Sequence, residues 1–242
     1  MAESDPFEMP GATAPVSSGL IRLALDHALA HRFSVLLEGT FRDPDMVVGT
    51  AVRFAGAGYR VEVVAVATPG MVSRLSAEQR SLGGGDGRFG RWTPPGAHES
   101  GLAGSSGVVA ALEASPVVRR VTVRSRERVL YENERAVDGQ WGGRPRAAEV
   151  LAAEQGRRLT PTQAVDWMAR YRAVFEAAAG RPGYLNRLTA PAYRALERDA
   201  VALIPVVAVD PAVDSGVLRR EADERGRLLA ARSDMFSVTD PS

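Results

Sequence analysis

The alternation of hydrophobic and polar positions predicts a helix, a strand and a second helix in the first part of the chain. Between Ser17 and His31, apolar residues fall three and four apart, which is the spacing of one helix face. The run 33–37 (FSVLL) has the length and composition of a buried strand and leads into the polar loop 38–44. Pro44 suits the start of a second helix, whose apolar face continues until a pair of glycines ends it.

The next elements extend the same alternation of helices and strands. A second strand is predicted over 60–67, and a helix follows it through Leu82. The order helix, strand, helix, strand, helix indicates an α/β fold with a mostly parallel, twisted sheet and flanking helices. We expect a short helix over 105–114 and then strands over 117–123 and 128–131 that close the sheet.

Two changes in composition divide the rest of the chain. The segment 83–91 is rich in glycine, which disfavours regular structure, so we expect a mobile loop there. After residue 143 the pattern is helical almost throughout, and Thr160 with its following Pro, Thr and Gln has the signature of a helix start. The sequence therefore predicts an α/β domain over 1–143 and an α-helical C-terminal region over 144–242.

Composition excludes several classes of chemistry for this chain. All 30 basic residues are arginines, so no lysine is present for a Schiff base or for a phosphate-binding loop. There is no cysteine for a disulfide, a thiol nucleophile or a zinc site, and three histidines are few for a metal cage, so we expect no metal site. The net charge of +1 provides no basic field, and we expect no nucleic-acid partner.

The sequence also predicts that the protein has no membrane partner. Its longest apolar run, 201–209, is too short to span a bilayer and is interrupted by Pro205. The N-terminal segment carries acids and prolines where a secretory signal would have a basic start and an apolar core. We therefore expect a cytoplasmic location.

The first candidate site is the loop that follows the predicted strand 33–37. Glu38, Thr40 and Arg42 bring a carboxylate, a hydroxyl and a guanidinium to that loop. Ligands of parallel α/β sheets bind outside the carboxyl ends of the strands, so these three residues form a candidate polar site. The alternative is a helix-capping loop in which Glu38 pairs with Arg42 or with solvent.

The second candidate site consists of Arg80 and Arg91, which bracket the glycine-rich segment. Two permanently charged guanidiniums beside a flexible loop suit a polyphosphate ligand. The alternative is that both arginines are simply solvated. His98 is interpreted as a capping or packing residue. His27 and His31 lie one helical turn apart, but no third ligand has a suitable spacing, so they are interpreted as surface residues.

Several motifs, taken in order, resemble the zeta-toxin family of bacterial toxin–antitoxin systems. They span residues 17–133. The matching segments are VLLEGTFRDP at 35–44, GYRVEVVAVA at 58–67, Ser73, Arg80, GRWTP at 90–94, AHE at 97–99 and LYEN at 130–133. The spacing of Glu38, Thr40 and Arg42 is the most specific of these features. The helical part resembles the C-terminal extension of longer family members.

The resemblance implies a P-loop-kinase-like fold and an ATP-dependent phosphotransferase. Such proteins use ATP and Mg²⁺ to phosphorylate the 3′-hydroxyl of UDP-N-acetylglucosamine, and an antitoxin protein is their partner. By the same resemblance, Glu38 is a sugar-nucleotide contact, and Thr40 and Arg42 shape the same pocket. Arg80 and Arg91 correspond to the two catalytic arginines that also bind the phosphates of the nucleotide.

The resemblance also implies that the kinase domain is truncated at its N-terminus. In the family, the phosphate-binding loop with its lysine and the aspartate that acts as base come before the region that matches Met1. Without them the chain lacks the groups that bind the nucleotide phosphates, so we expect this chain alone to be inactive. We also expect 33–37 and 60–67 to lose strand partners. Three alternatives remain open: a longer gene that begins upstream, a non-catalytic module that binds a sugar nucleotide or an antitoxin, and a decayed remnant.

Overall fold

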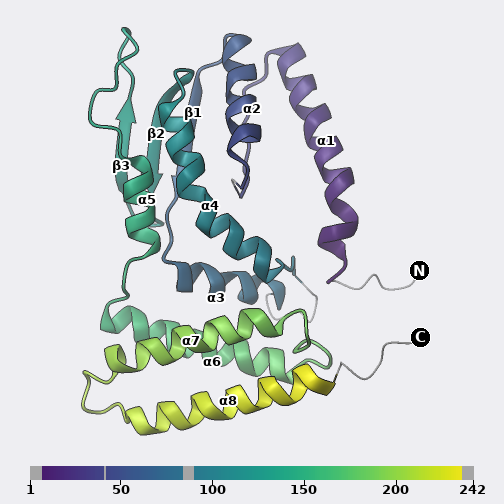
Figure 1. Ribbon diagram of the computed structural model, residues 1–242, viewed down its shortest axis with the longest axis vertical. Coiled ribbons are helices and arrows are strands. Elements are labelled where there is room, and N and C mark those ends of the chain that lie inside the picture. Colours follow the sequence, from purple (N-terminus) through teal and green to yellow (C-terminus); the bar gives the residue numbers. More distant parts are fainter. Residues whose placement is uncertain (1–6, 41, 84–89, 236–242) are drawn as a thin grey trace. The chain divides into compact units, whose positions relative to one another are not determined.

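The computed structural model describes residues 7–40, 42–83 and 90–235, and these residues form eight helices and three strands (Figure 1). In chain order the elements are α1 (Met9–His31), α2 (Pro44–Gly56), β1 (Val61–Val66), α3 (Gly70–Ser81), α4 (Pro95–Ala114), β2 (Val118–Arg124), β3 (Val129–Glu134), α5 (Ala147–Gln155), α6 (Pro161–Gly180), α7 (Ala190–Val207) and α8 (Ser215–Met235). None of the described helices is both long and apolar enough to cross a membrane.

The chain forms two compact units that are interleaved along the sequence. We call Gly11–Gly70 with Ala97–Arg157 the sheet unit, and Met1–Pro10 with Met71–Gly96 and Arg158–Ser242 the helical unit. Nearly all of α3 therefore folds with the C-terminal helices, and α5 folds with the strands.

The sheet of the sheet unit has the order β1-β2-β3. β1 pairs with β2 in parallel, with Val63 opposite Val121, and β2 pairs with β3 in antiparallel fashion, with Val121 opposite Asn133. The α/β class and the helical C-terminal region are confirmed. The sheet itself is mixed, because β3 follows β2 through a short turn, and only an antiparallel strand can do so.

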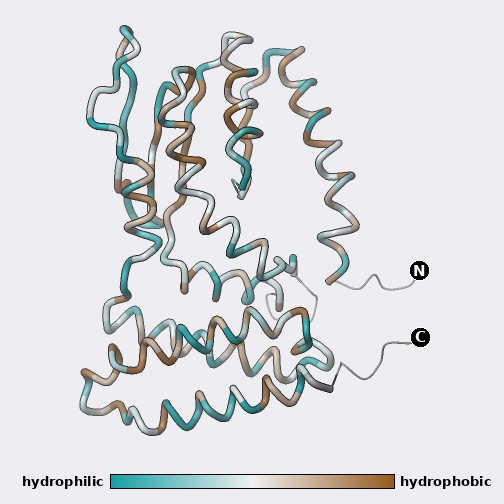
Figure 2. Tube along the Cα trace, viewed as in Figure 1, coloured by the Kyte–Doolittle hydropathy of each residue, from teal (hydrophilic) through white to brown (hydrophobic). Residues whose placement is uncertain are grey.

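One face of the sheet is covered by helices and carries the core of the sheet unit. α4 and α5 pack on this face, and Figure 2 shows hydrophobic stretches along α4 and the strands. The buried residues of this core include Val63, Ala65, Val108, Val109, Leu112, Val121, Val123, Ala147 and Leu151. The opposite face is polar: the Glu134 carboxylate lies 2.9 Å from the guanidiniums of both Arg60 and Arg120. Val64 and Val66 on that face are exposed.

The predicted strand over 33–37 is wrong. The segment has no regular secondary structure, its residues are exposed, and Leu36 is 97% accessible. A hydrophobic run becomes a strand only when its backbone groups pair with a neighbouring strand. Among the described residues β1 pairs with β2 alone, and 33–37 pairs with no strand. Among the described residues β1 thus has a strand partner on one side, and 33–37 has none.

Two predicted helices are longer than the pattern indicated. The helix expected from Ser17 begins at Met9 and continues through Pro15, and the helix expected over 105–114 begins at Pro95. Small residues and glycines fill the added turns of both helices, so no apolar stripe marked them in the sequence.

The helical unit has an aromatic core. Trp167, Tyr171 and Phe175 of α6 are buried, and Ala164 and Val174 of the same helix lie in the core with them. Leu75 of α3 lies in the same core and is completely buried. α6 begins as predicted, with a capping box in which Thr160 and Gln163 exchange hydrogen bonds.

The last helix packs on the core although few of its residues are apolar. α8 packs along α7, and Leu229 is buried. Arg225 donates to both carboxylate oxygens of Glu197, at 2.9 and 3.1 Å, and its guanidinium lies over the ring of Tyr171. A partly buried ion pair and a cation–π contact thus fasten this polar helix to the core.

Glu78 is a buried carboxyl in the helical unit. It is 2% exposed, and its Oε2 accepts a hydrogen bond of 3.3 Å from the hydroxyl of Tyr184. Burial raises the pKa of Glu78 from 4.5 to about 7, because the charged form is desolvated, while the hydrogen bond from Tyr184 acts in the opposite direction. The folded protein therefore binds more protons than the unfolded chain between these two pH values.

We predict that this group lowers stability as the pH rises. Its contribution is fully present below pH 4.5 and is lost as the pH rises to about 7, by about 3 kcal/mol in the free energy of unfolding. Glu78→Gln removes the titration and flattens the profile across this window. Urea unfolding at a series of pH values measures it, with the exposed Glu224→Gln as control. Equal pH dependence in the wild type and Glu78→Gln would contradict the prediction.

A second prediction concerns the start of α6. Thr160→Ala removes the side-chain acceptor for the backbone N–H of Gln163 and lowers the free energy of unfolding by about 1 kcal/mol. Thr162→Ala, two residues later on the exposed surface, leaves it unchanged or slightly raised. Thermal unfolding of both variants measures the difference, and a neutral Thr160→Ala would show that the cap contributes nothing.

Candidate functional site

The loop before α2 carries the first three predicted site residues, and all of them are exposed. Glu38 and Thr40 lie in irregular backbone, Arg42 follows, and position 41 lies outside the described residues. Asp43 caps α2: its Oδ1 accepts from the backbone N–H groups of Asp45, at 3.0 Å, and Met46, at 3.2 Å. The helix-capping role of this loop is therefore confirmed for Asp43. The Glu38–Arg42 ion pair of the alternative interpretation does not occur among the described contacts.

The loop lies against α4 beside Gly101. A Cβ atom added at Gly101 would lie 3.6 Å from the carbonyl oxygen of Thr40 and 3.8 Å from the Cγ of Arg42. The backbone of Thr40 and the stem of Arg42 therefore lie against the same point of α4. The structure thus brings Thr40 and Arg42 together in the sheet unit, with Glu38 two residues away along the chain.

The structure also brings Arg80 and Arg91 together, at the end of α3. The N–H of Gly90 donates to the carbonyl oxygen of Ser81 at 3.0 Å, and the Ser81 hydroxyl lies 3.4 Å from the carbonyl oxygen of Arg91. A Cβ atom on Gly90 would lie 1.7 Å from the carbonyl oxygen of Arg80, so only glycine fits there. Both arginine side chains are exposed, and neither has an ion-pair partner among the described residues.

The two groups of predicted site residues belong to different compact units. Glu38, Thr40 and Arg42 lie in the sheet unit, and Arg80 and Arg91 lie in the helical unit. A pocket shared by all five stays a prediction. The glycine-rich loop expected between the arginines falls mostly on residues 84–89, which lie outside the described residues.

The three histidines do not form a metal site. His98 lies in the first turn of α4 with its Nδ1 3.1 Å from Glu99 Oε1, and its side chain is largely buried. The rings of His27 and His31 are 4.2 Å apart, and both lie beside Phe33. Across the described part of the chain no three acidic or histidine side chains lie together in a way that could hold a metal ion.

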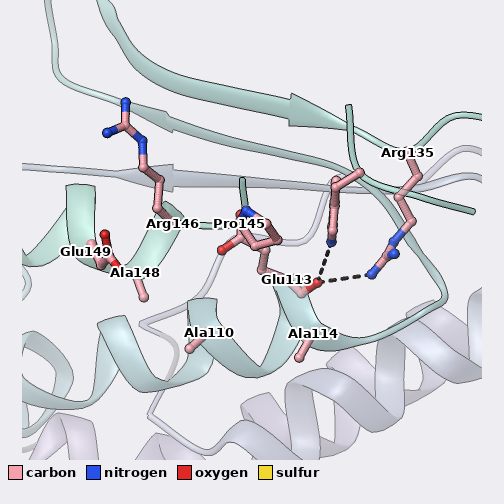
Figure 3. A pocket seen from close by; sticks show the side chains of 9 residues that line it. Ala110, Glu113, Ala114, Arg135, Pro145, Arg146, Ala148 and Glu149 are labelled. Carbon is pink, nitrogen blue, oxygen red and sulfur yellow. Dashed lines mark hydrogen bonds between the residues drawn. The ribbon is translucent and has the colours of Figure 1, made fainter. Parts of the chain in front are cut away.

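A depression of about 500 Å³ lies in the sheet unit beside the end of α4 (Figure 3). Its polar groups already bind one another. The Glu113 carbonyl oxygen accepts from the guanidinium of Arg135 and from the indole N–H of Trp141, both at 3.1 Å. Figure 3 labels Glu113 and Arg135 at this junction. The Glu113 carboxylate accepts from the hydroxyl of Tyr131 at 2.7 Å and from the N–H of Ala147 at 2.9 Å. These contacts join α4 to β3 and α5, so the depression is a structural junction.

The LYEN segment, which resembles the end of the family's catalytic domain, belongs to this junction. The Asn133 amide donates to the hydroxyl of Tyr131 and to the carbonyl oxygen of Gly143, each at 2.9 Å, and accepts from the N–H of Gly143 at 3.0 Å. Burial and the nearby Glu113 carboxylate raise the pKa of Tyr131. The two residues fix the chain after β3 and present no free group to a ligand.

Sequence reasoning missed Gly90 and Ser81, which hold the two arginines together. Gly90 lies in a glycine-rich stretch, so the sequence does not distinguish it from the neighbouring glycines. Ser81 ends an ordinary helical pattern and is 1% exposed. Gly90 stands in the matched segment GRWTP at 90–94, but the sequence does not show that it contacts the backbone of Arg80.

Comparison with known proteins agrees with the resemblance seen in the motifs. A search of curated protein sequences finds no match. Among solved structures, the chain is similar to one from a study of the PezAT chromosomal toxin–antitoxin system of the human pathogen Streptococcus pneumoniae, with 15% sequence identity and a TM-score of 0.49. That match covers 66% of this chain and 62% of the other, so the chain spans less than two thirds of that relative. The family model of the Zeta toxin matches residues 1–136, more than half of the chain, and the protein belongs to the zeta toxin family.

Proposed function

We propose that this chain carries the sugar-nucleotide contact and the phosphate-binding arginines of an ATP-dependent phosphotransferase acting on UDP-N-acetylglucosamine. The observation that carries the proposal is the family match over residues 1–136, which includes all five predicted site residues. The juxtaposed, exposed Arg80 and Arg91 agree with it, because two permanently charged guanidiniums suit the phosphate groups of ATP.

The residues present fit the phosphates of ATP better than they fit its metal ion. Arg80 and Arg91 would contact the transferring phosphoryl group, whose oxygens gain charge in the transition state. Magnesium prefers carboxylate and other oxygen ligands, and no cluster of such side chains lies among the described residues. We therefore assign no residue of this chain to Mg²⁺.

Glu38 and its neighbours suit the acceptor. An ionised carboxylate accepts hydrogen bonds only, so Glu38 would accept from the hydroxyl groups of the sugar. The Thr40 hydroxyl and the Arg42 guanidinium would contact the phosphates of the sugar nucleotide from the same loop. Proton removal from the attacking hydroxyl is not assigned to any residue of this chain.

A second candidate function is binding without phosphoryl transfer, with an antitoxin protein as the partner. α1 favours it, because Val16, Leu20 and Leu23 on this helix are each more than 60% exposed. An apolar stripe on an exposed helix is typical of a surface that takes a partner helix. Either function would operate in the cytoplasm, where nucleotide-activated sugars and ATP are found.

We predict that the purified chain binds UDP-N-acetylglucosamine and that Glu38→Ala weakens binding at least tenfold, the loss of one hydrogen bond to a charged group. Titration calorimetry measures the affinity. Glu127→Ala, an exposed acid in the turn between β2 and β3, is the matched control and leaves binding unchanged. Absence of binding by the wild type would reject the sugar-nucleotide assignment.

A separate measurement distinguishes the two candidate functions. ATP, Mg²⁺ and UDP-N-acetylglucosamine are incubated with the chain, and mass spectrometry detects the phosphorylated sugar nucleotide. A product that Arg80→Ala and Arg91→Ala abolish supports the phosphotransferase. Sugar-nucleotide binding with no product supports the binding module and rejects phosphoryl transfer by this chain.

A further inference from the structure

The helix that carries Arg80 is built into the core of the helical unit. Leu75 of α3 is completely buried and Leu82 is 9% exposed, and both lie in one hydrophobic cluster with Trp167 of α6. The indole N–H of Trp167 donates to the carbonyl oxygen of Met71 at 3.0 Å. Arg74 also forms an ion pair with Asp199 of α7. The C-terminal helices therefore determine where α3 lies within this unit.

The end of α3 is fastened on both sides of Arg80. The guanidinium of Arg181 donates to the carbonyl oxygen of Leu82 at 3.2 Å. Carbonyl groups at a helix C-terminus have no partner within the helix, and the negative end of the helix dipole favours a cation there. Two residues before Arg80, Glu78 accepts from the hydroxyl of Tyr184. Arg181 and Tyr184 both belong to the segment between α6 and α7.

The segment that carries Arg91 is held to the same place. Ser81, the last residue of α3, is joined by hydrogen bonds to the backbone of Gly90 and Arg91. The next residue, Trp92, is 7% exposed, and its ring meets that of Phe7 edge to face at 5.1 Å. Phe7 in turn packs on Tyr184, with ring centroids 5.7 Å apart. Tyr184 is thus close to both ends of the arginine-bearing loop.

We propose that Arg181 and Tyr184, through the C-terminal helices, position Arg80 and Arg91 for binding a chain of phosphates. Both are positioning residues, since their own polar groups are directed at the protein. The nature of the ligand rests on the proposed function, whereas the fastening of the two arginines does not. The region 137–242 lies beyond the family match, and by this proposal it helps to form the phosphate-binding site.

Hydrogen exchange and a binding assay on the full chain test the two parts of this proposal, with inorganic tripolyphosphate as the probe. We expect Arg181→Ala to speed exchange of the backbone amides at 81–83 and 90–92 at least tenfold and to weaken tripolyphosphate binding about tenfold. Arg181→Lys restores most of both, because an ammonium group also donates to the Leu82 carbonyl. The exposed Arg187→Ala, six residues away, changes neither.

A second variant acts on the loop without touching the helical core. Gly90→Ala forces the backbone away from the carbonyl oxygen of Arg80, so we expect the same loss of tripolyphosphate binding with exchange in α6 and α7 unchanged. Gly226→Ala in α8, where an added Cβ meets nothing within 4 Å, is the control.

The outcomes separate this inference from the proposed function. Unchanged exchange at 81–83 and 90–92 in Arg181→Ala would show that Arg181 does not hold the end of α3 in place. Faster exchange in Arg181→Ala with unchanged tripolyphosphate binding would show that Arg181 does not position Arg80 and Arg91 for phosphate binding. If the wild type does not bind tripolyphosphate, the phosphate ligand and the proposed function are rejected together, and the exchange data alone then decide the fastening.

Discussion

Burial of the inner face of α3 is the interaction on which the arrangement of the phosphate-binding candidates depends. A helix of about a dozen residues is marginal in water by itself, and its stability comes from packing. For α3 that packing is supplied by Leu75 and Leu82, which lie in the core formed by α6, α7 and α8. Arg80 is consequently placed by residues far away in the sequence, although it follows β1 closely along the chain.

The strands show how far local pattern determines this fold. The runs predicted over 60–67 and 117–123 became β1 and β2, because each found the other as a parallel partner. The run 33–37 has an equally good composition and stayed exposed. Composition shows that a segment is suited to a sheet, whereas strand formation also needs a neighbour, which no local pattern reports. The capping box at Thr160 was predictable because all of its partners lie within four residues.

In the candidate site, too, local features were predictable from the sequence and long-range contacts were not. Glu38, Thr40 and Arg42 were predicted from residue types in a short loop, and Arg80 and Arg91 from their places on either side of a glycine-rich segment and from a family resemblance. The contacts that hold the arginines were not identifiable. Arg181 is one of 30 arginines, and nothing in its neighbourhood indicates a carbonyl oxygen 99 residues away. Glu78 follows the polar pattern of a surface helix, and only the tertiary fold buries it against Tyr184.

The electrostatics of Arg80 and Arg91 argue for an anionic ligand. Two unit charges 4 Å apart in water repel each other by about 1 kcal/mol, so electrostatics alone would not bring two guanidiniums together. Here the backbones of the two residues are brought together, through the Gly90–Ser81 hydrogen bond and a contact that only glycine permits. The packing of Trp92 and the hydrogen bond from Arg181 to the Leu82 carbonyl oxygen hold the same stretch of backbone. A polyphosphate bound between the two side chains would turn the repulsion into two favourable interactions, and it would do so without any change in the core that holds them.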